Sequence, residues 1–425
     1  MTKIINNLTS DVVRVRIAPS PTGVPHIGNT RTALFNYLFA RHNKGKFIVR
    51  IEDTDRARLV PESEEAIYEI LKWLGLTWDE KYKQSERVEI YKKHAEQLLK
   101  KDLAYKDEGA MRFKMPKTGE TFWNDLIGHK HISFKNETQE DFIIIKSDGF
   151  PTYNFANVID DHLMEITHVI RGEEFISSTP KHIQLYKAFN WPHPEFAHLP
   201  IILGPDRTKL SKRHGAESVL YYREQGYLKE AILNYMVLLG WNPGEDREIM
   251  DIKVMRKLFD LKDVNTNSPI FNIDKLNWFN GYYIRSLSED KLFLRIKNIG
   301  LEIKDERLAR QLVSPAQSRM ETLNDFTGLI KPFVETVILN STIEHKEIIK
   351  ELLTRFKRIT EWKRSEIYIE IRHLCISRRV NMKIVYKALT GKEEGLPLAD
   401  TFEILGKEKV LARLSKLERL KKETI

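Results

Sequence analysis

The chain has 425 residues, of which 41% are apolar and 10% aromatic. This length predicts about two to four domains, and this composition excludes a disordered chain. A single cysteine, Cys375, excludes a disulfide framework and a metal site built from several cysteines. The N-terminus lacks the apolar core of a secretory signal, and no apolar run approaches the roughly 18 residues of a membrane span. We therefore expect a cytoplasmic protein without membrane contact.

The net charge of +9 is concentrated near the C-terminus. Residues 289–425 contain 28 Lys and Arg against 21 Asp and Glu, so they carry +7 of the total. Eight of these basic residues lie between Arg355 and Arg379. Such a surface suits a polyanion such as RNA, and it is equally compatible with an ordinary solvated helical face.

Strand and helix signals alternate through the first hundred residues. Residues 12–17 ("VVRVRI") and 46–51 ("KFIVRI") have the β-branched composition of strands. Residues 26–42 and 61–75 have helical spacing, and the second begins with a proline and acids and ends at a glycine. This order predicts a parallel α/β sheet.

Later segments change character. Short β-like runs and turns occupy about 87–154, and "ITHVIRGEE" (166–174) reads as another buried strand followed by a helix. Beyond about residue 200 the pattern becomes mainly helical, with "EAILNYMVLLGWNPG" and "KVLARLSKLERLKK" as the clearest helices. No internal repeat or low-complexity linker is present.

Three charged residues fall at the ends of predicted strands. Arg16 ends the first strand, Glu52 follows the second, and Arg171 ends "THVIR". Ligands of open parallel sheets bind at the carboxyl ends of the strands. We therefore expect a binding site at this edge, although a single charge at a strand end is usually a solvated rim residue.

The segment "APSPTGVPHIGNTR" (18–31) places a stiff loop before a helix start. Unpaired N–H groups at a helix N-terminus suit phosphate, and His26 can bond phosphate oxygens. Gly28 would let a nucleotide approach the backbone. Pro19, Pro21 and Gly23 limit the loop's conformations, which predicts a preorganised site. The alternative is that His26 simply caps the helix.

A second loop, "DRTKLSKRHG" (206–215), carries Lys209, Ser211 and Lys212 between a turn and a helix. Two lysines around a serine can stabilise the charge that grows on a departing phosphate. An exposed basic loop without function is the alternative. No "GxxxxGK[ST]" or "GxGxxG" motif occurs, so ATP binding would depend on these two loops.

Together the motifs resemble a known family. "HIGN" and "KLSKR" resemble the HIGH and KMSKS signatures of class I aminoacyl-tRNA synthetases. The longer blocks "RIAPSPTGVPHIGNTRTALFNYLFAR", "GKFIVRIEDTDRAR", "DGFPTYNFANVIDDHLMEITHVIRGEE" and "FAHLPIILGPDRTKLSKRHGAESV" look like successive parts of bacterial-type glutamyl-tRNA synthetases. The resemblance covers most of the chain to about Arg285 and continues more thinly to the end.

The resemblance implies a class I Rossmann-like parallel sheet with an inserted acceptor-binding domain, followed by helical stem-contact and all-α anticodon-binding domains. The implied boundaries are residues 1–86 and 155–188 for the catalytic domain, 87–154 for the insertion, 189–288 for the stem-contact domain with the KLSKR loop, and 289–425 for the anticodon-binding region, divided near 340. A monomer is expected.

It also implies an activity. The family activates L-glutamate with ATP and Mg²⁺ to glutamyl-adenylate and transfers it to the 3′ end of tRNA(Glu), releasing AMP and pyrophosphate. The implied catalytic residues are His26, Gly28, Lys209 and Lys212. The implied glutamate-binding residues are Arg16, Ala18, Ser20, Glu52, Tyr153, Asn157 and Arg171. The implied ATP-binding residues are His26, Gly28, Glu174, Lys209, Ser211 and Lys212.

Two features of the chain qualify the resemblance. "SRMETL" matches the segment where family members set an arginine against the anticodon, which makes Arg319 the candidate reader, with a plain surface arginine as the alternative. Residues 103–114 are shorter than the family's usual stretch and contain no cysteine, so we predict no zinc.

Other readings compete with this one. A non-discriminating enzyme that also charges tRNA(Gln), and a catalytically silent tRNA-binding paralogue, both fit parts of the pattern. "RIAPSPTG" and a helical C-terminus disfavour a glutaminyl-tRNA synthetase. The roughly 140 residues beyond Arg285 disfavour a truncated paralogue that modifies a tRNA base, and a dinucleotide-dependent enzyme lacks its glycine-rich fingerprint.

Overall fold

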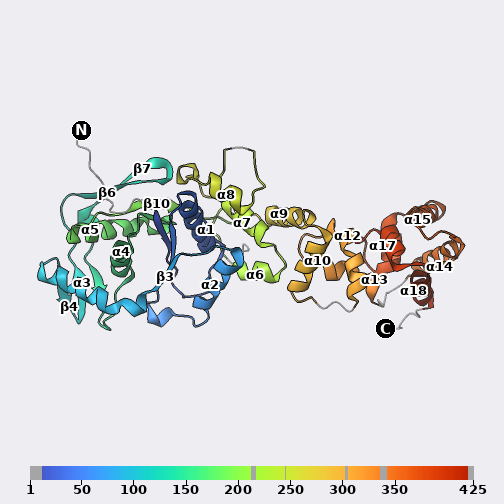
Figure 1. Cartoon of the computed structure of the whole chain (residues 1–425), viewed down its shortest axis with the longest axis horizontal. Helices are drawn as coiled ribbons and strands as arrows, with labels where there is room; N and C mark the ends of the chain where they lie inside the picture. The colour runs from blue at the N-terminus through green and yellow to red at the C-terminus, as the bar shows by residue number, and fades with distance from the viewer. Residues whose placement is uncertain (1–11, 212–216, 245, 302–304, 336–341, 420–425) are drawn as a thin grey trace. The chain divides into compact units, whose positions relative to one another are not determined.

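The computed structural model describes residues 12–211, 217–244, 246–301, 305–335 and 342–419. Two compact units make up the chain (Figure 1). The first comprises Met1–Arg223 and Lys229–Leu276, and the second comprises Glu224–Leu228 and Asn277–Ile425. The finer boundaries at 86, 154, 188 and 288 stay a prediction. No helix among the described residues has the length and apolar character needed to cross a membrane.

A parallel sheet organises the first unit, as the alternating pattern predicts. Strands β1 (Arg14–Ile17), β2 (Lys46–Ile51) and β3 (Glu80–Lys83) pair in parallel in that order. Strands β9 (His168–Gly172) and β10 (Glu195–Leu199) form a second parallel pair. Thr167 joins the two pieces, because its N–H donates to Arg14 O and its hydroxyl accepts from Arg14 N.

Helices return the chain between these parallel strands. They are α1 (Ile27–His42), α2 (Ser63–Leu74) and α5 (Thr179–Phe189). Helix α1 is buried on nearly every side, Arg31 and Asn36 included, so its sequence lacks a clean apolar stripe. Helix α2 ends at Gly75, whose φ of 73° forms a left-handed cap.

The segment between β3 and α4 (Tyr153–Leu163) is a small antiparallel structure. Helix α3 (Val88–Lys100) packs beside the three-stranded sheet β4 (Ala104–Asp107), β5 (Ala110–Phe113) and β8 (Phe142–Ile145). Strands β6 (Glu120–Asp125) and β7 (Lys130–Lys135) form a separate ribbon whose first strand packs on β10. Trp123 and Ile132 of the ribbon join the core that contains Ile48, Val169 and Phe196.

The stretch predicted to be short closes as a tight hairpin. Glu108 and Gly109 alone connect β4 to β5, with φ values of 47° and 81°. Positive φ at both positions is the geometry of a two-residue hairpin whose twist matches its strands. No further secondary structure intervenes between residues 103 and 114.

Two further helices of the first unit pack on α1. Helices α7 (Lys229–Leu238) and α8 (Ile252–Leu258) pack directly on it, and α7 also contacts α2. Helix α6 (Val219–Glu224) precedes them, and α9 (Ile273–Arg285) begins in the first unit and ends in the second.

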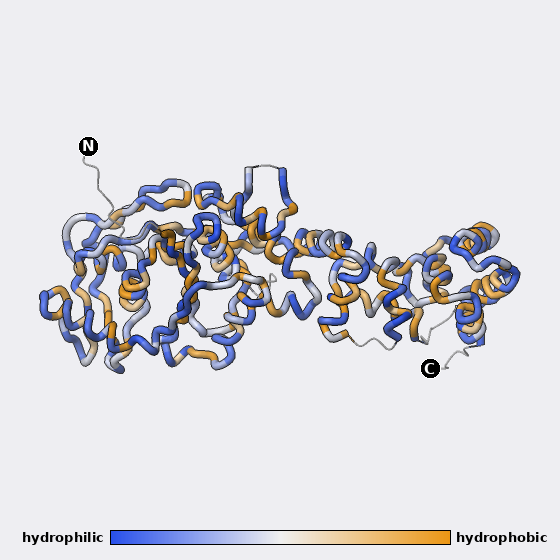
Figure 2. Tube along the Cα trace, in the orientation of Figure 1, coloured by the Kyte–Doolittle hydropathy of each residue, from blue (hydrophilic) through white to orange (hydrophobic). Residues whose placement is uncertain are grey.

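The described residues of the second unit are helical, as predicted. Its helices are α10 (Glu289–Asn298), α11 (Glu306–Gln311), α12 (Val313–Gln317), α13 (Asp325–Val334), α14 (Ile343–Arg358), α15 (Arg364–Arg378), α16 (Met382–Thr390), α17 (Leu398–Leu405) and α18 (Lys407–Arg419). Figure 2 shows hydrophobic and hydrophilic residues alternating along them, as expected for helices that bury one face. Part of the basic run is neutralised internally, because Arg355 and Arg378 both pair with Glu351.

Candidate active site

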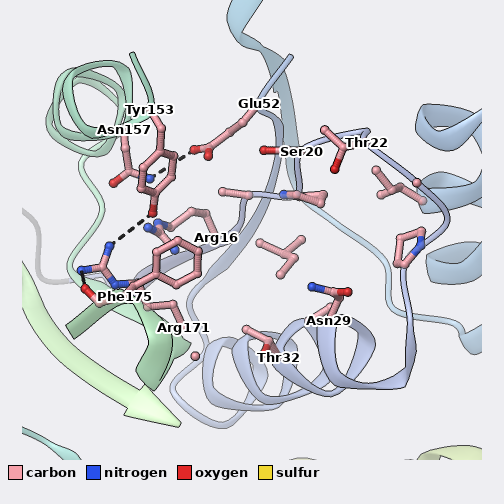
Figure 3. A pocket seen from close by; sticks show the side chains of 18 of the residues that line it. Arg16, Ser20, Thr22, Asn29, Thr32, Glu52, Tyr153, Asn157, Arg171 and Phe175 are labelled. Atoms are coloured by element: carbon pink, nitrogen blue, oxygen red, sulfur yellow. Dashed lines mark hydrogen bonds between the residues drawn. The ribbon is translucent and has the colours of Figure 1, made fainter. Parts of the chain in front are cut away.

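A cavity of about 890 Å³ lies at the carboxyl ends of β1, β2 and β9. Nine of the predicted site residues line it: Arg16, Ala18, Ser20, His26, Glu52, Tyr153, Asn157, Arg171 and Glu174. Figure 3 shows Arg16 and Tyr153 next to Arg171, with Asn29 and Thr32 of α1 along another wall. The three strand-end charges therefore share one cavity.

The proline-rich loop after β1 is fixed by the segment that follows β2. The carbonyl of Pro19 accepts from Glu52 N at 3.0 Å, and that of Pro21 accepts from Val60 N at 3.0 Å. Because proline also restricts φ, the loop keeps Ser20 at a set distance from the helix start. Ser20 and His26 both line the cavity.

His26 is the N-cap of α1. Its Nδ1 accepts from Gly28 N at 3.0 Å, so the ring proton is on Nε2, which can donate to a ligand. Burial is the main cause that lowers the pKa of His26, and the charge of Lys209 lowers that pKa further. The imidazole is therefore a neutral donor at pH 7.

Gly28 does not line the cavity. A Cβ at this position would lie 2.8 Å from Cε1 of the His26 ring and 3.0 Å from its Nδ1. Glycine is therefore required at position 28 for a structural reason, because any larger residue would displace the capping imidazole.

A buried chain of opposite charges runs through the floor of the cavity. Nε and Nη2 of Arg16 donate to the two carboxylate oxygens of Asp161 at 3.0 and 3.2 Å. Arg50 Nη1 donates to Asp161 at 2.7 Å, and Arg50 Nη2 donates to Glu52 Oε1 at 2.9 Å. All four residues are at most 4% exposed. Nη1 of Arg16 has no partner within the described residues, so it is available to a ligand.

Glu52 also has one oxygen for a ligand. Its Oε1 accepts from Arg50 and from Asn157 Nδ2, the latter at 3.1 Å, whereas no described residue donates to its Oε2. Burial raises the pKa of this carboxyl, and the neighbouring arginines oppose that rise. A cationic ligand group would therefore be attracted to Oε2.

Arg171 differs from Arg16 and Arg50 because no carboxylate pairs with it within the described residues. Its side chain is 4% exposed, and burial lowers its pKa. Two of its neighbours also line the cavity: Tyr153, whose hydroxyl lies 3.4 Å from Nη1, and Phe175, whose carbonyl accepts from Nη2 at 3.3 Å. A buried, unneutralised guanidinium is a site for an anion.

The second predicted loop approaches the same helix start. Lys209 forms an isolated bridge with Leu203, and Ser218 forms one with His26 itself. Ser211 is half-buried and does not line the cavity. Lys212, predicted as the stronger catalytic lysine, lies outside the described residues. Arg319 belongs to the other unit, where it is exposed between α12 and α13.

The sequence analysis missed the residues that support this cavity from behind. They are Arg50, Asp125, Asp160, Asp161, His182 and His198, all buried. The only sequence signal for any of them was the pair of adjacent acids in "VIDDHL", Asp160 and Asp161. Acids that are buried on a helix need cationic partners, so such a pair indicates buried arginines or lysines nearby. Among the described residues no group of three or more His, Cys, Asp or Glu could hold a metal ion. The absence of zinc stays a prediction.

Comparison with known proteins defines the class. Residues 12–110 and 107–278 match the family model of class I tRNA synthetases (E and Q), catalytic domain. Residues 283–417 match the model of an anticodon binding domain. The parallel sheet, the cavity at its strand ends and the helical second unit are thus those of a class I aminoacyl-tRNA synthetase.

Full-length relatives narrow the class to one family. Glutamate–tRNA ligase of Aquifex aeolicus is 41% identical over 471 residues, covering 96% of this chain and 99% of that protein. The ligase of a Chlamydia trachomatis strain is 38% identical, with 97% and 94% covered. A crystal structure of a glutamate tRNA ligase from Elizabethkingia meningosepticum in complex with its amino acid has a TM-score of 0.83 at 34% identity, with 97% and 100% covered. The chain belongs to the glutamate–tRNA ligase family.

The first relative has residues that this chain lacks, because its alignment spans 471 positions against the 425 residues of the chain. The two matches to the catalytic-domain model meet at residues 107–110, which contain the Glu108–Gly109 turn. That a longer family segment is shortened at this turn stays a prediction.

Proposed function

We propose how the cavity performs the reaction of this family, the ATP-dependent ligation of L-glutamate to the 3′ end of tRNA(Glu). The supporting observation is that two buried charges of the cavity keep an open side for a ligand. No carboxylate pairs with Arg171, and no donor reaches Oε2 of Glu52, within the described residues. The two groups complement the side-chain carboxylate and the α-ammonium of glutamate.

The two ends of glutamate bind to opposite charges. Glu52 Oε2 and the Ser20 hydroxyl receive the α-ammonium. Arg171, with Tyr153 OH and the open Nη1 of Arg16, receives the side-chain carboxylate. Glutamine is rejected because its amide would leave a buried guanidinium without an anion.

The α-carboxylate is left without a strong ion pair, and this matters for the chemistry. A carboxylate is already a nucleophile, so no general base is required for it to attack the α-phosphorus of ATP. A new C–O–P linkage forms, the bond from phosphorus to the bridging oxygen breaks, and pyrophosphate leaves with its electron pair. Catalysis then consists of positioning the reactants and stabilising charge on the phosphates.

ATP is placed at the start of α1. Nε2–H of His26 donates to a phosphate oxygen from one side, and Lys209 faces the same region. Glu174 lines the cavity near His26 and belongs to the proposed ATP set. Mg²⁺, which accompanies ATP in this class, would neutralise phosphate charge. Ser211 and Lys212 complete the proposed ATP set, with Lys212 on the pyrophosphate.

The second step uses tRNA. A hydroxyl of the 3′-terminal ribose attacks the carbonyl carbon of the adenylate, and AMP leaves. The anticodon-binding match at 283–417 supports tRNA as the partner of the second unit. Arg319 is exposed, and its guanidinium has no ion pair within the described residues, so we assign it to an anticodon base edge.

The alternatives have less support. A silent tRNA-binding paralogue would not need the unneutralised Arg171 or the open oxygen of Glu52. A non-discriminating enzyme differs only in its choice of tRNA, and an arginine at 319 favours tRNA(Glu) alone. We further propose a cytoplasmic monomer.

Arg16→Ala tests the proposed glutamate site, with Arg223→Ala as a control that removes only a surface pair with Glu69. The KM for glutamate should rise about 10- to 100-fold, because a charged hydrogen-bond donor is lost, while the KM for ATP stays within about twofold. Pyrophosphate exchange with tRNA(Glu) present measures both constants. An equal rise in both would remove Arg16 from the glutamate site.

A further inference from the structure

The acceptors around Arg171 are all uncharged. Nε donates to His198 Nε2 at 3.2 Å, and Nη1 lies 3.2 Å from His182 Nδ1. Nη2 donates to Thr179 Oγ1 at 2.8 Å and to Phe175 O at 3.3 Å. With the Tyr153 contact, these neutral groups hold the plane of the guanidinium and leave its charge in place.

Each of the two histidines can accept a hydrogen bond from Arg171 in only one of its neutral tautomers. Nδ1 of His198 lies 2.5 Å from Asp125 Oδ2, which places the proton on Nδ1 and leaves the lone pair of Nε2 for Arg171. Nε2 of His182 lies 3.0 Å from Asn154 Oδ1, which leaves its Nδ1 as the acceptor. Burial lowers the pKa of both rings, in keeping with their neutral form.

A carboxylate in place of either imidazole would hold Arg171 equally well and would also neutralise it. The substrate's carboxylate would then meet a neutral pair rather than a cation. Neutral acceptors orient the guanidinium without neutralising its positive charge, and an anion site needs both an oriented donor and an uncompensated charge. This is the physical reason for two histidines beside an arginine that has no acid partner.

Asp125 is itself firmly placed. Its Oδ1 accepts from the backbone N–H of His198 and Ile127, both at 3.1 Å, and Trp123 Nε1 donates to its Oδ2 at 3.3 Å. Asp125 ends β6, the ribbon strand that packs on β10, and His198 is on β10. The inserted segment thus supplies a residue that acts on the glutamate pocket through a strand of the sheet.

We propose that Asp125 and His198 are positioning residues for glutamate: Asp125 fixes the His198 tautomer, and Nε2 of His198 orients the charged Arg171 guanidinium toward the cavity. The inference rests on the proposed role of Arg171. Neither residue lines the cavity, so neither contacts the substrate.

Asp125→Asn tests the tautomer. The asparagine oxygen can still accept from the two backbone N–H groups, while its NH₂ faces His198 Nδ1 and moves the ring proton to Nε2. The new N–H on His198 Nε2 then faces the Nε–H of Arg171, and the hydrogen bond between them is lost. The KM for glutamate should rise about 10- to 100-fold, with kcat and the KM for ATP within about twofold. Asp141→Asn is the matched control, because Asp141 also accepts from a backbone N–H of the inserted segment, that of Met115, and has no hydrogen bond to His198 or Arg171.

A pair of substitutions at His198 separates positioning from packing. His198→Gln places an amide oxygen near the former Nε2, so it keeps an acceptor for Arg171. The shorter side chain of His198→Asn places its amide near Asp125 only, so Arg171 loses this acceptor. We expect a glutamate KM within about threefold of the parent for Gln and at least about tenfold higher for Asn, with the preference for glutamate over glutamine reduced in the Asn variant alone.

Equal constants for the two His198 variants, or an unchanged glutamate KM in Asp125→Asn, would overturn the inference. So would a parallel loss in kcat and in both KM values for all three variants, since that is the result of a purely structural role. A parent enzyme that fails to activate glutamate would instead refute the proposed function, which keeps the two failures distinguishable.

Discussion

Glu52→Gln tests the ammonium site with an almost isosteric change. The glutamine oxygen can replace Oε1 as the acceptor for Arg50 and Asn157, which donate at 2.9 and 3.1 Å. Its NH₂ then occupies the place of Oε2, facing the cavity. The substitution therefore turns an anionic acceptor into a donor at the point where we place the α-ammonium.

The expected loss follows from the lost ionic hydrogen bond. Such a bond contributes about 1.5–3 kcal/mol, which is about 10- to 150-fold in affinity. Folding should survive, because burial opposes the ionisation of Glu52 and raises its pKa, and a neutral amide avoids that desolvation cost. Arg50 keeps Asp161 at 2.7 Å. We expect an unchanged or slightly higher melting temperature.

The assay compares two ligands that differ only in the ammonium group. Glutamate KM and inhibition by glutarate are measured by pyrophosphate exchange with tRNA(Glu) present, in the parent, in Glu52→Gln and in the exposed control Glu96→Gln. In Glu52→Gln the KM for glutamate should rise about 10- to 150-fold, whereas the inhibition constant of glutarate should rise by less than about threefold. An equal loss for both ligands would refute the assignment of Glu52.

Three further results are expected. Gly28→Ala should displace the His26 ring, lose about 1 kcal/mol of capping and raise the KM for ATP more than that for glutamate; an unchanged ATP constant would contradict this. Arg319→Gln should lower charging of tRNA(Glu) about tenfold without changing glutamate-dependent pyrophosphate exchange at saturating tRNA; unaltered charging would exclude Arg319. Burial lowers the pKa of His168 to about 4, so unfolding takes up a proton below pH 6.5 and stability falls by up to ~3 kcal/mol as the pH drops to 4. His168→Gln should flatten that decline in thermal unfolding, and an unchanged pH dependence would count against it.

The position of the site could be predicted from the sequence because parallel strands end at one edge. Arg16 and Arg171 lie near the ends of recognisable strands and Glu52 directly follows one, and that alone places them around one cavity. The ends of the elements were less predictable. The first strand begins at Arg14 rather than Val12, because the register with the second strand starts at the pair Arg14 and Lys46.

The partners of these charges could not be predicted. Arg16 is on strand β1 and pairs with Asp161, which lies 145 residues away on helix α4. Nothing local in the sequence shows that Asp161 accepts from two nitrogens of the Arg16 guanidinium and leaves the third available to a ligand. His182 and His198 sit in apolar-rich stretches, where a histidine that accepts from a guanidinium has no distinguishing neighbour. Long-range polar contacts of this kind follow from tertiary packing alone.

The activity itself is tested most directly by aminoacylation with glutamate and glutamine, each crossed with tRNA(Glu) and tRNA(Gln). Arg171 has no carboxylate partner within the described residues, which predicts rapid transfer of glutamate to tRNA(Glu) and at least about a thousandfold weaker use of glutamine. Comparable use of glutamine, or no charging by either amino acid, would contradict the assignment of the pocket.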